Sequence, residues 1–213
     1  MGNHDYRHAA SLMVMVGLPG SGKTTLARRL TADSLLVSTD AIRAELFGSE
    51  TIQGPWLSIE ACATEKLLQA KNQVQQSTQA LEPIIYPVIY DATNVVRRQR
   101  RRVIQQARRL GFAAVYGCWL DTPYDLCLAR NLQRSRRVPE AVVQRMQRRL
   151  EGAPPDLSDG FDGLVRVRDC TNTKAFDVKR QAGAVAGPAP QVEKVRESRS
   201  PQWHNRTQSL FRT

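Results

Sequence analysis

The chain has 213 residues, 41% of them hydrophobic, which is enough for one packed domain, and its four scattered cysteines (Cys62, Cys118, Cys127 and Cys170) argue against a zinc site and for a reducing, cytoplasmic compartment. No apolar run approaches the roughly 18–20 residues of a membrane span, and the N-terminus lacks the apolar core of a signal peptide, so we expect no membrane partner. The net charge of +11 favours a polyanionic partner, although an arginine-rich proteome or simple solubility would give the same excess.

The first predicted element is a buried strand over 12–16, which leads through the octapeptide GLPGSGKT at 17–24 into a helix over 23–30. The octapeptide has the form G-x-x-x-x-G-K-[ST], and a preceding strand and following helix are the context in which this motif binds phosphate. Its glycines let backbone N–H groups point at an anion, and the helix N-terminus adds a partial positive charge. The residues expected to hold a nucleoside triphosphate are Gly17, Pro19, Gly20, Ser21, Gly22, Lys23, Thr24 and Thr25.

Two residues of this loop have separate predicted roles. Lys23 is expected to reach the β- and γ-phosphates of ATP, and Thr24 is expected to supply a hydroxyl ligand to Mg²⁺. ATP and Mg²⁺ are therefore the predicted cofactors.

Strands and helices alternate along the rest of the chain. We expect strands at 35–38, 88–90, 112–120 and 164–167, and helices at 41–47, 57–81, 97–110, 124–132 and 139–150. This order predicts an α/β fold, a P-loop NTPase three-layer sandwich with a mainly parallel five-stranded sheet. The helix over 97–110 is strongly basic and adds to the case for a nucleic-acid partner.

Acidic residues follow two of the predicted strands. Asp40 comes after the second strand as the expected cap of the helix over 41–47, and Asp91 ends the third. Ligands bind outside the carboxyl ends of the strands in an open parallel sheet, so both carboxylates are expected beside the transferable phosphate. Asp40 is the candidate general base, and Arg43, one helical turn further, is the candidate clamp for an acceptor phosphate. Asp91 and Asn94 are assigned to the acceptor, although Asp91 could instead orient Arg43, hold a metal-bound water or serve as a turn residue.

The segment 130–137 is rich in arginine and directly precedes a helix that begins at a proline. Arginines that close over a nucleotide neutralise charge on the phosphoryl oxygens and help to exclude water. We therefore expect a helical lid here, with Arg130 and Arg134 one turn apart and both facing the phosphates. An exposed basic helix end is the alternative.

With these motifs in order, the chain resembles the 5′-hydroxyl polynucleotide kinase domain of phage end-healing enzymes, in the AAA-type ATP-binding kinase group. The matching motifs, spread over residues 11 to about 168, are the loop at 17–25, Asp40-x-x-Arg43, Asp91-x-Thr93-Asn94, Arg130-Asn131-x-x-Arg134, Val138-Pro139-Glu140 and Gly160-Phe161-Asp162. The resemblance implies that Asp40, Arg43 and Arg134 serve as general base, acceptor-phosphate clamp and transition-state arginine. No phosphatase or ligase domain accompanies these motifs, so a place in end repair does not follow.

The extent of the motifs and a shift in composition near residue 181 set the expected organisation of the chain. We assign 1–10 to an N-terminal extension, 11–180 to a P-loop kinase domain and 181–213, rich in Ala, Gly, Pro, Ser and Arg, to a flexible basic tail. The leading functional hypothesis is transfer of the γ-phosphate of ATP to the 5′-hydroxyl end of RNA or DNA. A kinase for another acceptor, such as an aminoacyl-tRNA or a small alcohol, and an ATP-binding regulatory protein are the alternatives. The sequence leaves the oligomeric state open.

Overall fold

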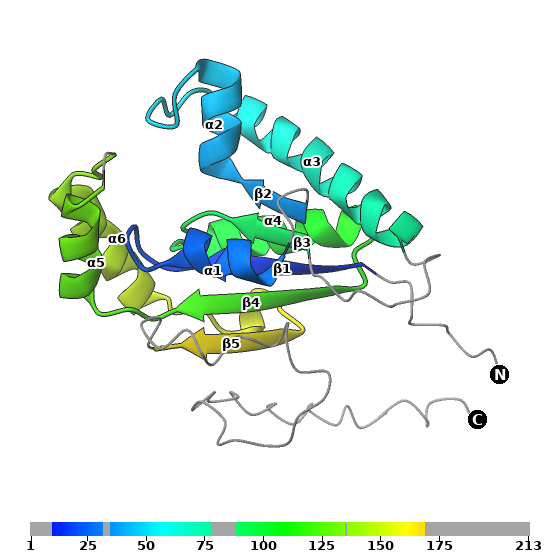
Figure 1. Ribbon diagram of the computed structural model, residues 1–213. Coiled ribbons are helices and arrows are strands. Elements are labelled where there is room, and N and C mark those ends of the chain that lie inside the picture. Colours follow the sequence, from blue (N-terminus) through cyan, green and yellow to red (C-terminus); the bar gives the residue numbers. More distant parts are fainter. Residues whose placement is uncertain (1–9, 32–34, 78–87, 135, 169–213) are drawn as a thin grey trace, which may run out of the picture.

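A computed structural model describes residues 10–31, 35–77, 88–134 and 136–168 (Figure 1). The predicted tail at 181–213 lies outside the described residues, as does the predicted N-terminal extension apart from Ala10. Within the described ranges, none of the helices combines the length and the apolar content that crossing a bilayer requires.

A five-stranded sheet forms the centre of the molecule. Its strands are β1 (Ser11–Val16), β2 (Leu36–Ser38), β3 (Val88–Asp91), β4 (Ala114–Leu120) and β5 (Gly163–Val167), in the order β2-β3-β1-β4-β5. Every pairing is parallel, which confirms the predicted α/β fold and makes the sheet parallel throughout. Strands β2 and β3 lie on one side of the central β1, and β4 and β5 lie on the other. The strand order therefore reverses at β1, and its carboxyl end is the point at which such folds bind ligands.

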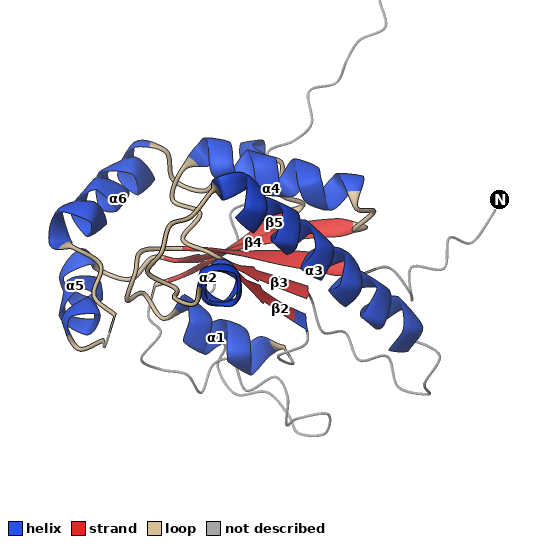
Figure 2. Cartoon of the chain, turned by 90° about the horizontal axis from the view of Figure 1, so that it is seen from above, coloured by secondary structure: helices blue, strands red, loops and turns tan. Residues whose placement is uncertain are grey.

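Helices cover both faces of the sheet, as Figure 2 shows. One face carries α1 (Lys23–Leu30), and the other carries α3 (Trp56–Ser77) and α4 (Arg97–Arg109). The remaining helices are α2 (Thr39–Phe47), α5 (Tyr124–Leu132), α6 (Glu140–Gly152) and a short 3-10 helix, η3 (Leu157–Asp159). The arrows of the strands point toward α5 and α6, so these two helices lie beyond the carboxyl ends of the sheet (Figure 1).

The core has two layers because the sheet is buried on both faces. Along β1, Leu12 and Val14 pack in the larger cluster with α3 and α4, whereas Met15 packs in the smaller cluster with Leu26 and Ala27 of α1. This alternation is the two-residue period of a strand. The continuous apolar run of β1 therefore serves two layers at once and fixes the strand, and with it the phosphate loop, in the middle of the fold.

One predicted boundary is wrong in a way that matters for the site. Helix α2 begins at Thr39, and its N-cap is Ser38, whose hydroxyl accepts a hydrogen bond from the backbone N–H of Ala41. Asp40 therefore lies in the first turn and does not cap the helix. Because Ser38 accepts the hydrogen bond at the helix N-terminus, the Asp40 carboxylate is available for other partners.

Candidate active site

A cavity of about 1040 Å³ lies at the carboxyl ends of the strands. The predicted site residues that line it are Pro19, Gly20, Gly22, Lys23, Thr24, Thr25, Asp40, Arg43, Asp91, Asn94, Arg130 and Arg134. Gly17 and Ser21 lie behind this lining: the Gly17 N–H donates to the carbonyl of Thr93, and Ser21 is fully buried. The fold thus gathers residues from four separate stretches of sequence around one space.

The phosphate loop depends on glycine at two positions. Gly20 has φ of 82°, and a Cβ added there would meet the carbonyl oxygen of Cys127 at 2.3 Å. Gly22 has φ of 96° and leads directly into α1, which begins without a side-chain cap. Both conformations are rare for residues with a Cβ, so glycine keeps the loop close to α5 and leaves the first N–H groups of α1 unoccupied by side chains.

Lys23 is almost completely buried under this loop. Its ammonium donates to the carbonyl of Leu18 at 2.7 Å and, more weakly, to the hydroxyl of Ser21 at 3.4 Å. The pKa of Lys23 is lowered to about 8, chiefly by burial and to a smaller extent by Arg134, while Asp91, Cys127 and Asp40 act in the opposite direction. These influences reveal that Lys23, Arg134 and both carboxylates share one electrostatic environment.

Substituting Lys23 by Met is expected to change how stability depends on pH. In the wild type, the pKa of Lys23 is about 8 in the folded chain and 10.5 when unfolded, so the unfolded chain holds more protons between these values. Stability therefore rises with pH in that window, and Lys23→Met removes the rise. Urea titrations from about pH 7 to about pH 10 should show wild type gaining roughly 2–3 kcal/mol of unfolding free energy relative to the variant. If the difference in unfolding free energy between wild type and variant stayed constant over this pH range, the lowered pKa of Lys23 would be contradicted.

Thr24 and Asp91 meet at the end of the phosphate loop. The Thr24 hydroxyl donates to Oδ2 of Asp91 at 2.7 Å, and Asp91 is 5% exposed. A hydroxyl beside a carboxylate is the oxygen donor set that Mg²⁺ uses next to nucleotide phosphates, which supply further ligands. The two residues therefore fit a magnesium ion, and of the roles left open for Asp91 this contact favours the one beside the metal.

Asp40 lies between two arginines. Arg43 donates to its Oδ1 at 2.8 Å, as the spacing of three residues predicts, and Arg136 contacts its Oδ2 at 3.0 Å. The carboxylate is 47% exposed to the cavity side, and each oxygen retains a further lone pair. Arg136 also pairs with Glu50 at 3.0 Å. The sequence analysis missed Arg136 as a site residue, because nothing local distinguishes it from its arginine neighbours.

Arg43 carries an unsatisfied donor. Its side chain is 13% exposed, and its Nε is buried without a hydrogen-bond partner among the described residues. A desolvated guanidinium N–H that lacks an acceptor is costly, and such groups often mark a ligand site. Since Arg43 also lines the cavity, an anionic group of a substrate would satisfy it.

The arginine segment forms the loop between α5 and α6. Helix α5 ends at Leu132, so Arg134 follows the helix rather than lying one turn from Arg130 within it, yet both line the cavity. Asn131 holds this loop closed, because its buried amide both donates to the carbonyl of Val138 and accepts from its N–H, at 2.7 Å and 3.0 Å. Arg130 is therefore presented by the last turn of α5, and Arg134 by the loop that Asn131 holds in place.

Asn94 braces the loop that follows β3. It adopts φ of 48°, is 4% exposed, and donates from its amide to the carbonyl of Met15 at 2.7 Å. A role for Asn94 in binding the acceptor stays a prediction. Its amide ties the β3 loop to the strand that carries the phosphate loop.

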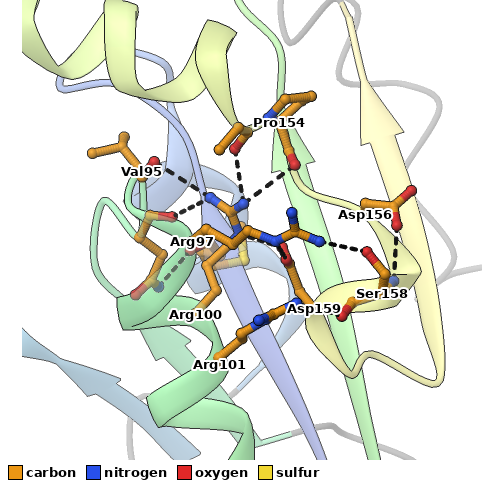
Figure 3. Close-up of polar contacts among 11 residues, drawn as sticks. Val95, Arg97, Arg100, Arg101, Pro154, Asp156, Ser158 and Asp159 are labelled. Atoms are coloured by element: carbon orange, nitrogen blue, oxygen red, sulfur yellow. Dashed lines mark hydrogen bonds and ion pairs between the residues drawn. The ribbon is translucent and has the colours of Figure 1, made fainter.

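Behind this loop lies a buried arginine, which Figure 3 shows with its partners. Arg100 is 0% exposed and donates from Nε to Asp159 at 2.6 Å, while its other nitrogens reach the carbonyls of Asn94, Val95, Ala153 and Pro154. Arg97 donates to the second oxygen of the same carboxylate at 2.7 Å. Arg100 therefore fastens the β3 loop to η3 and to the segment after α6.

This cluster shows that not all the arginines of the strongly basic helix over 97–110 are available to a nucleic-acid partner. Arg100 shares one face of α4 with the buried residues Val103, Ile104 and Ala107, at helical spacings of three, four and seven. That periodicity is the signal that could have identified it. Arg102 pairs with Glu60 and Arg108 with Asp162, so much of the charge of this helix is balanced within the fold.

The sheet order, the phosphate loop and the residues gathered around it define a P-loop protein of the kinase type. A family model described as an AAA domain matches residues 12–153. The chain belongs to this AAA domain family, whose P-loop implies ATP binding; the family leaves the acceptor open.

Individual relatives are more distant. The chain is 25% identical over 142 residues to an L-seryl-tRNA(Sec) kinase of Methanococcus maripaludis, covering 66% of this chain and 52% of that protein. A chain in the structure of the Pnkp1/Rnl/Hen1 RNA repair complex matches with a TM-score of 0.53 and 22% identity, over 76% of this chain and 49% of its own. A gluconokinase of Sinorhizobium meliloti matches with a TM-score of 0.44 and 19% identity, over 76% of this chain and 85% of its own. The chain thus spans about half the length of the first two, and the structural likenesses concern the fold.

Proposed function

We propose that this protein is an ATP-dependent kinase that transfers the γ-phosphate to a hydroxyl, and that its acceptor is the 5′-hydroxyl end of RNA or DNA. The observation that carries the proposal is the position of Asp40. Its carboxylate is bound by Arg43 and Arg136 and opens onto the same cavity as Lys23 of the phosphate loop. A carboxylate beside the transferable phosphate is what a general base for an attacking hydroxyl requires.

Each residue then has a role in positioning or charge stabilisation. Lys23 and the N–H groups of the loop hold the phosphates of ATP, and Asp40 accepts the proton of the attacking hydroxyl. Arg43 binds a phosphate of the acceptor through the N–H that lacks a partner within the described fold. Arg130 and Arg134 neutralise charge on the transferred group.

Mg²⁺ completes the donor side of the proposed site. Thr24 and Asp91 would hold the ion, and when bound it would neutralise charge on the β- and γ-phosphates. Within the described residues there is no group of three or more acidic, His or Cys side chains suited to a metal. That is compatible with Mg²⁺, which is commonly bound by one or two protein ligands together with phosphates and water.

The size of the cavity is compatible with two substrates. Ligand pockets usually enclose about 300–1,000 Å³, and this cavity of about 1040 Å³ lies at the upper end of that range. An acceptor that carries phosphate suits Arg43, whose Nε lacks a partner among the described residues, better than a neutral alcohol does. The relative named as an L-seryl-tRNA(Sec) kinase supports an acceptor linked to RNA, and it keeps an aminoacyl-tRNA as the second candidate.

Transfer of labelled phosphate from [γ-³²P]ATP tests the proposal directly. We expect label on RNA or DNA oligonucleotides that end in a 5′-hydroxyl, and none on the same oligonucleotides blocked by a 5′-phosphate. Seryl-tRNA and gluconate serve as competing acceptors in parallel reactions. Label on those acceptors alone would assign a different kinase activity, and label found only in inorganic phosphate would indicate an ATP-hydrolysing regulatory protein.

A further inference from the structure

The cavity continues past the phosphate loop along the groove between α3 and α4, which lie on the same face of the sheet (Figure 2). Its walls there include Trp56 and Glu60 of α3 and Arg98, Arg102 and Gln106 of α4. The three α4 residues are spaced by four, so they project from one side of the helix. We call this stretch the α3–α4 groove. It leads away from the place where Asp40 and the phosphate loop meet.

The groove presents arginine in a form suited to phosphate. Arg98 is exposed and makes no hydrogen bond or ion pair with any residue that the structure describes. Arg102 is 53% exposed and pairs with Glu60 on the opposite wall. Elsewhere on α4, Arg100 is fully buried against a carboxylate. Of the arginines on α4, Arg98 and Arg102 are thus the two that a phosphate could reach from within the cavity.

An exposed aromatic side chain stands in the same space. Trp56 is 39% exposed at the first position of α3, and it lines the cavity with the arginines. An indole beside cationic side chains is the combination that proteins use for single-stranded nucleic acid, since bases stack on the ring and arginines follow the backbone. A small alcohol acceptor would engage neither feature.

We infer that the α3–α4 groove binds the single-stranded nucleic acid that continues from the acceptor nucleotide, with Arg98 and Arg102 at its phosphates and Trp56 against a base. The inference rests on the proposed function and extends it, because it makes an oligonucleotide a better acceptor than a single nucleotide. Glu60 has the opposite sign and competes with phosphate for Arg102. Its removal should therefore strengthen binding.

Binding of 3′-fluorescein-labelled, 5′-hydroxyl RNA and DNA strands of about ten nucleotides tests this groove by fluorescence anisotropy. The slope of log K against the logarithm of the salt concentration should become less steep by about 0.7 for each lost phosphate contact. For the double variant Arg98→Ala/Arg102→Ala the change should be about 1.4. Trp56→Ala should weaken binding roughly five- to hundredfold. Glu60→Gln should tighten it, a gain that misfolding cannot imitate. The matched control is Arg109→Ala, which removes an exposed arginine of α4 outside the cavity.

Kinetics on the same strands separate this inference from the proposed function. We expect the double arginine variant to lose kcat/KM for the oligonucleotide while keeping kcat/KM for a nucleoside 3′-monophosphate. If the double variant and Arg109→Ala bound the strands equally well and with the same salt dependence, the proposed role of the groove would be overturned. The kinase proposal would still stand. Groove-dependent binding without phosphate transfer would overturn the kinase proposal alone. A wild-type protein that neither binds nor phosphorylates these strands would overturn both.

Discussion

Replacing Asp40 by Asn is expected to lower kcat for phosphate transfer by about 10²–10⁴-fold, while the affinity for ATP stays close to that of the wild type. The amide is nearly isosteric with the carboxylate, and its oxygen still accepts a hydrogen bond from one arginine. It cannot accept the proton of the attacking hydroxyl. The loss should therefore appear in the chemical step, measured as kcat at saturating ATP and oligonucleotide, with ATP affinity followed by calorimetry.

Asp125→Asn is the matched control for this experiment. Like Asp40, Asp125 is an acidic residue in the first turn of a helix, but it is exposed on α5 and does not line the cavity. Its replacement should leave transfer unchanged within a factor of about two, because it touches neither substrate. A similar rate for Asp40→Asn and the wild type would rule out Asp40 as the base. A loss of ATP affinity equal to the loss of rate would point to a binding role instead.

Replacing Arg100 by Met is expected to destabilise the fold by about 3–5 kcal/mol. The substitution leaves Asp159, which is 4% exposed, without its buried partner, and it removes the donors to four backbone carbonyls. Arg97 continues to contact the same carboxylate and limits the loss. Urea denaturation of the two proteins at neutral pH measures the difference, and an unchanged slope with a lower midpoint would identify it as a change in stability.

Arg101→Met provides the control, because Arg101 is the exposed neighbour of Arg100 on the same helix and makes one hydrogen bond, to the carbonyl of Ser158 at 3.2 Å. Its effect should stay within about 0.5 kcal/mol. Equal stability of the two variants would contradict the role given to Arg100. Asp159→Asn in the Arg100→Met background should recover part of the lost stability, because it removes a buried charge that the half-exposed Arg97 compensates only in part.

Local spacing predicted the parts of the fold and of the site that involve neighbouring residues. The apolar runs predicted the strands, and the pattern of the octapeptide at 17–24 predicted the phosphate loop between β1 and α1. The contact of Asp40 with Arg43 follows from a spacing of three in a helix. The cap of α2 was misplaced by two residues, since Ser38 and Asp40 are both favourable capping residues and the choice depends on where β2 stops.

By itself, the sequence determined that this chain has a phosphate loop between a strand and a helix, and that acidic and basic residues follow the strands beside it. Only the tertiary structure decided which of the many arginines do what. Arg100 meets a carboxylate 59 residues away, and Thr24 meets Asp91 across 67 residues. Helical spacing can mark Arg100 as lying on the apolar face of α4, but the partner of each arginine depends on what the folded chain packs against it. Arg100 is therefore buried against Asp159, and Arg136 pairs with Asp40 in the site. Arg98 lies exposed in the α3–α4 groove.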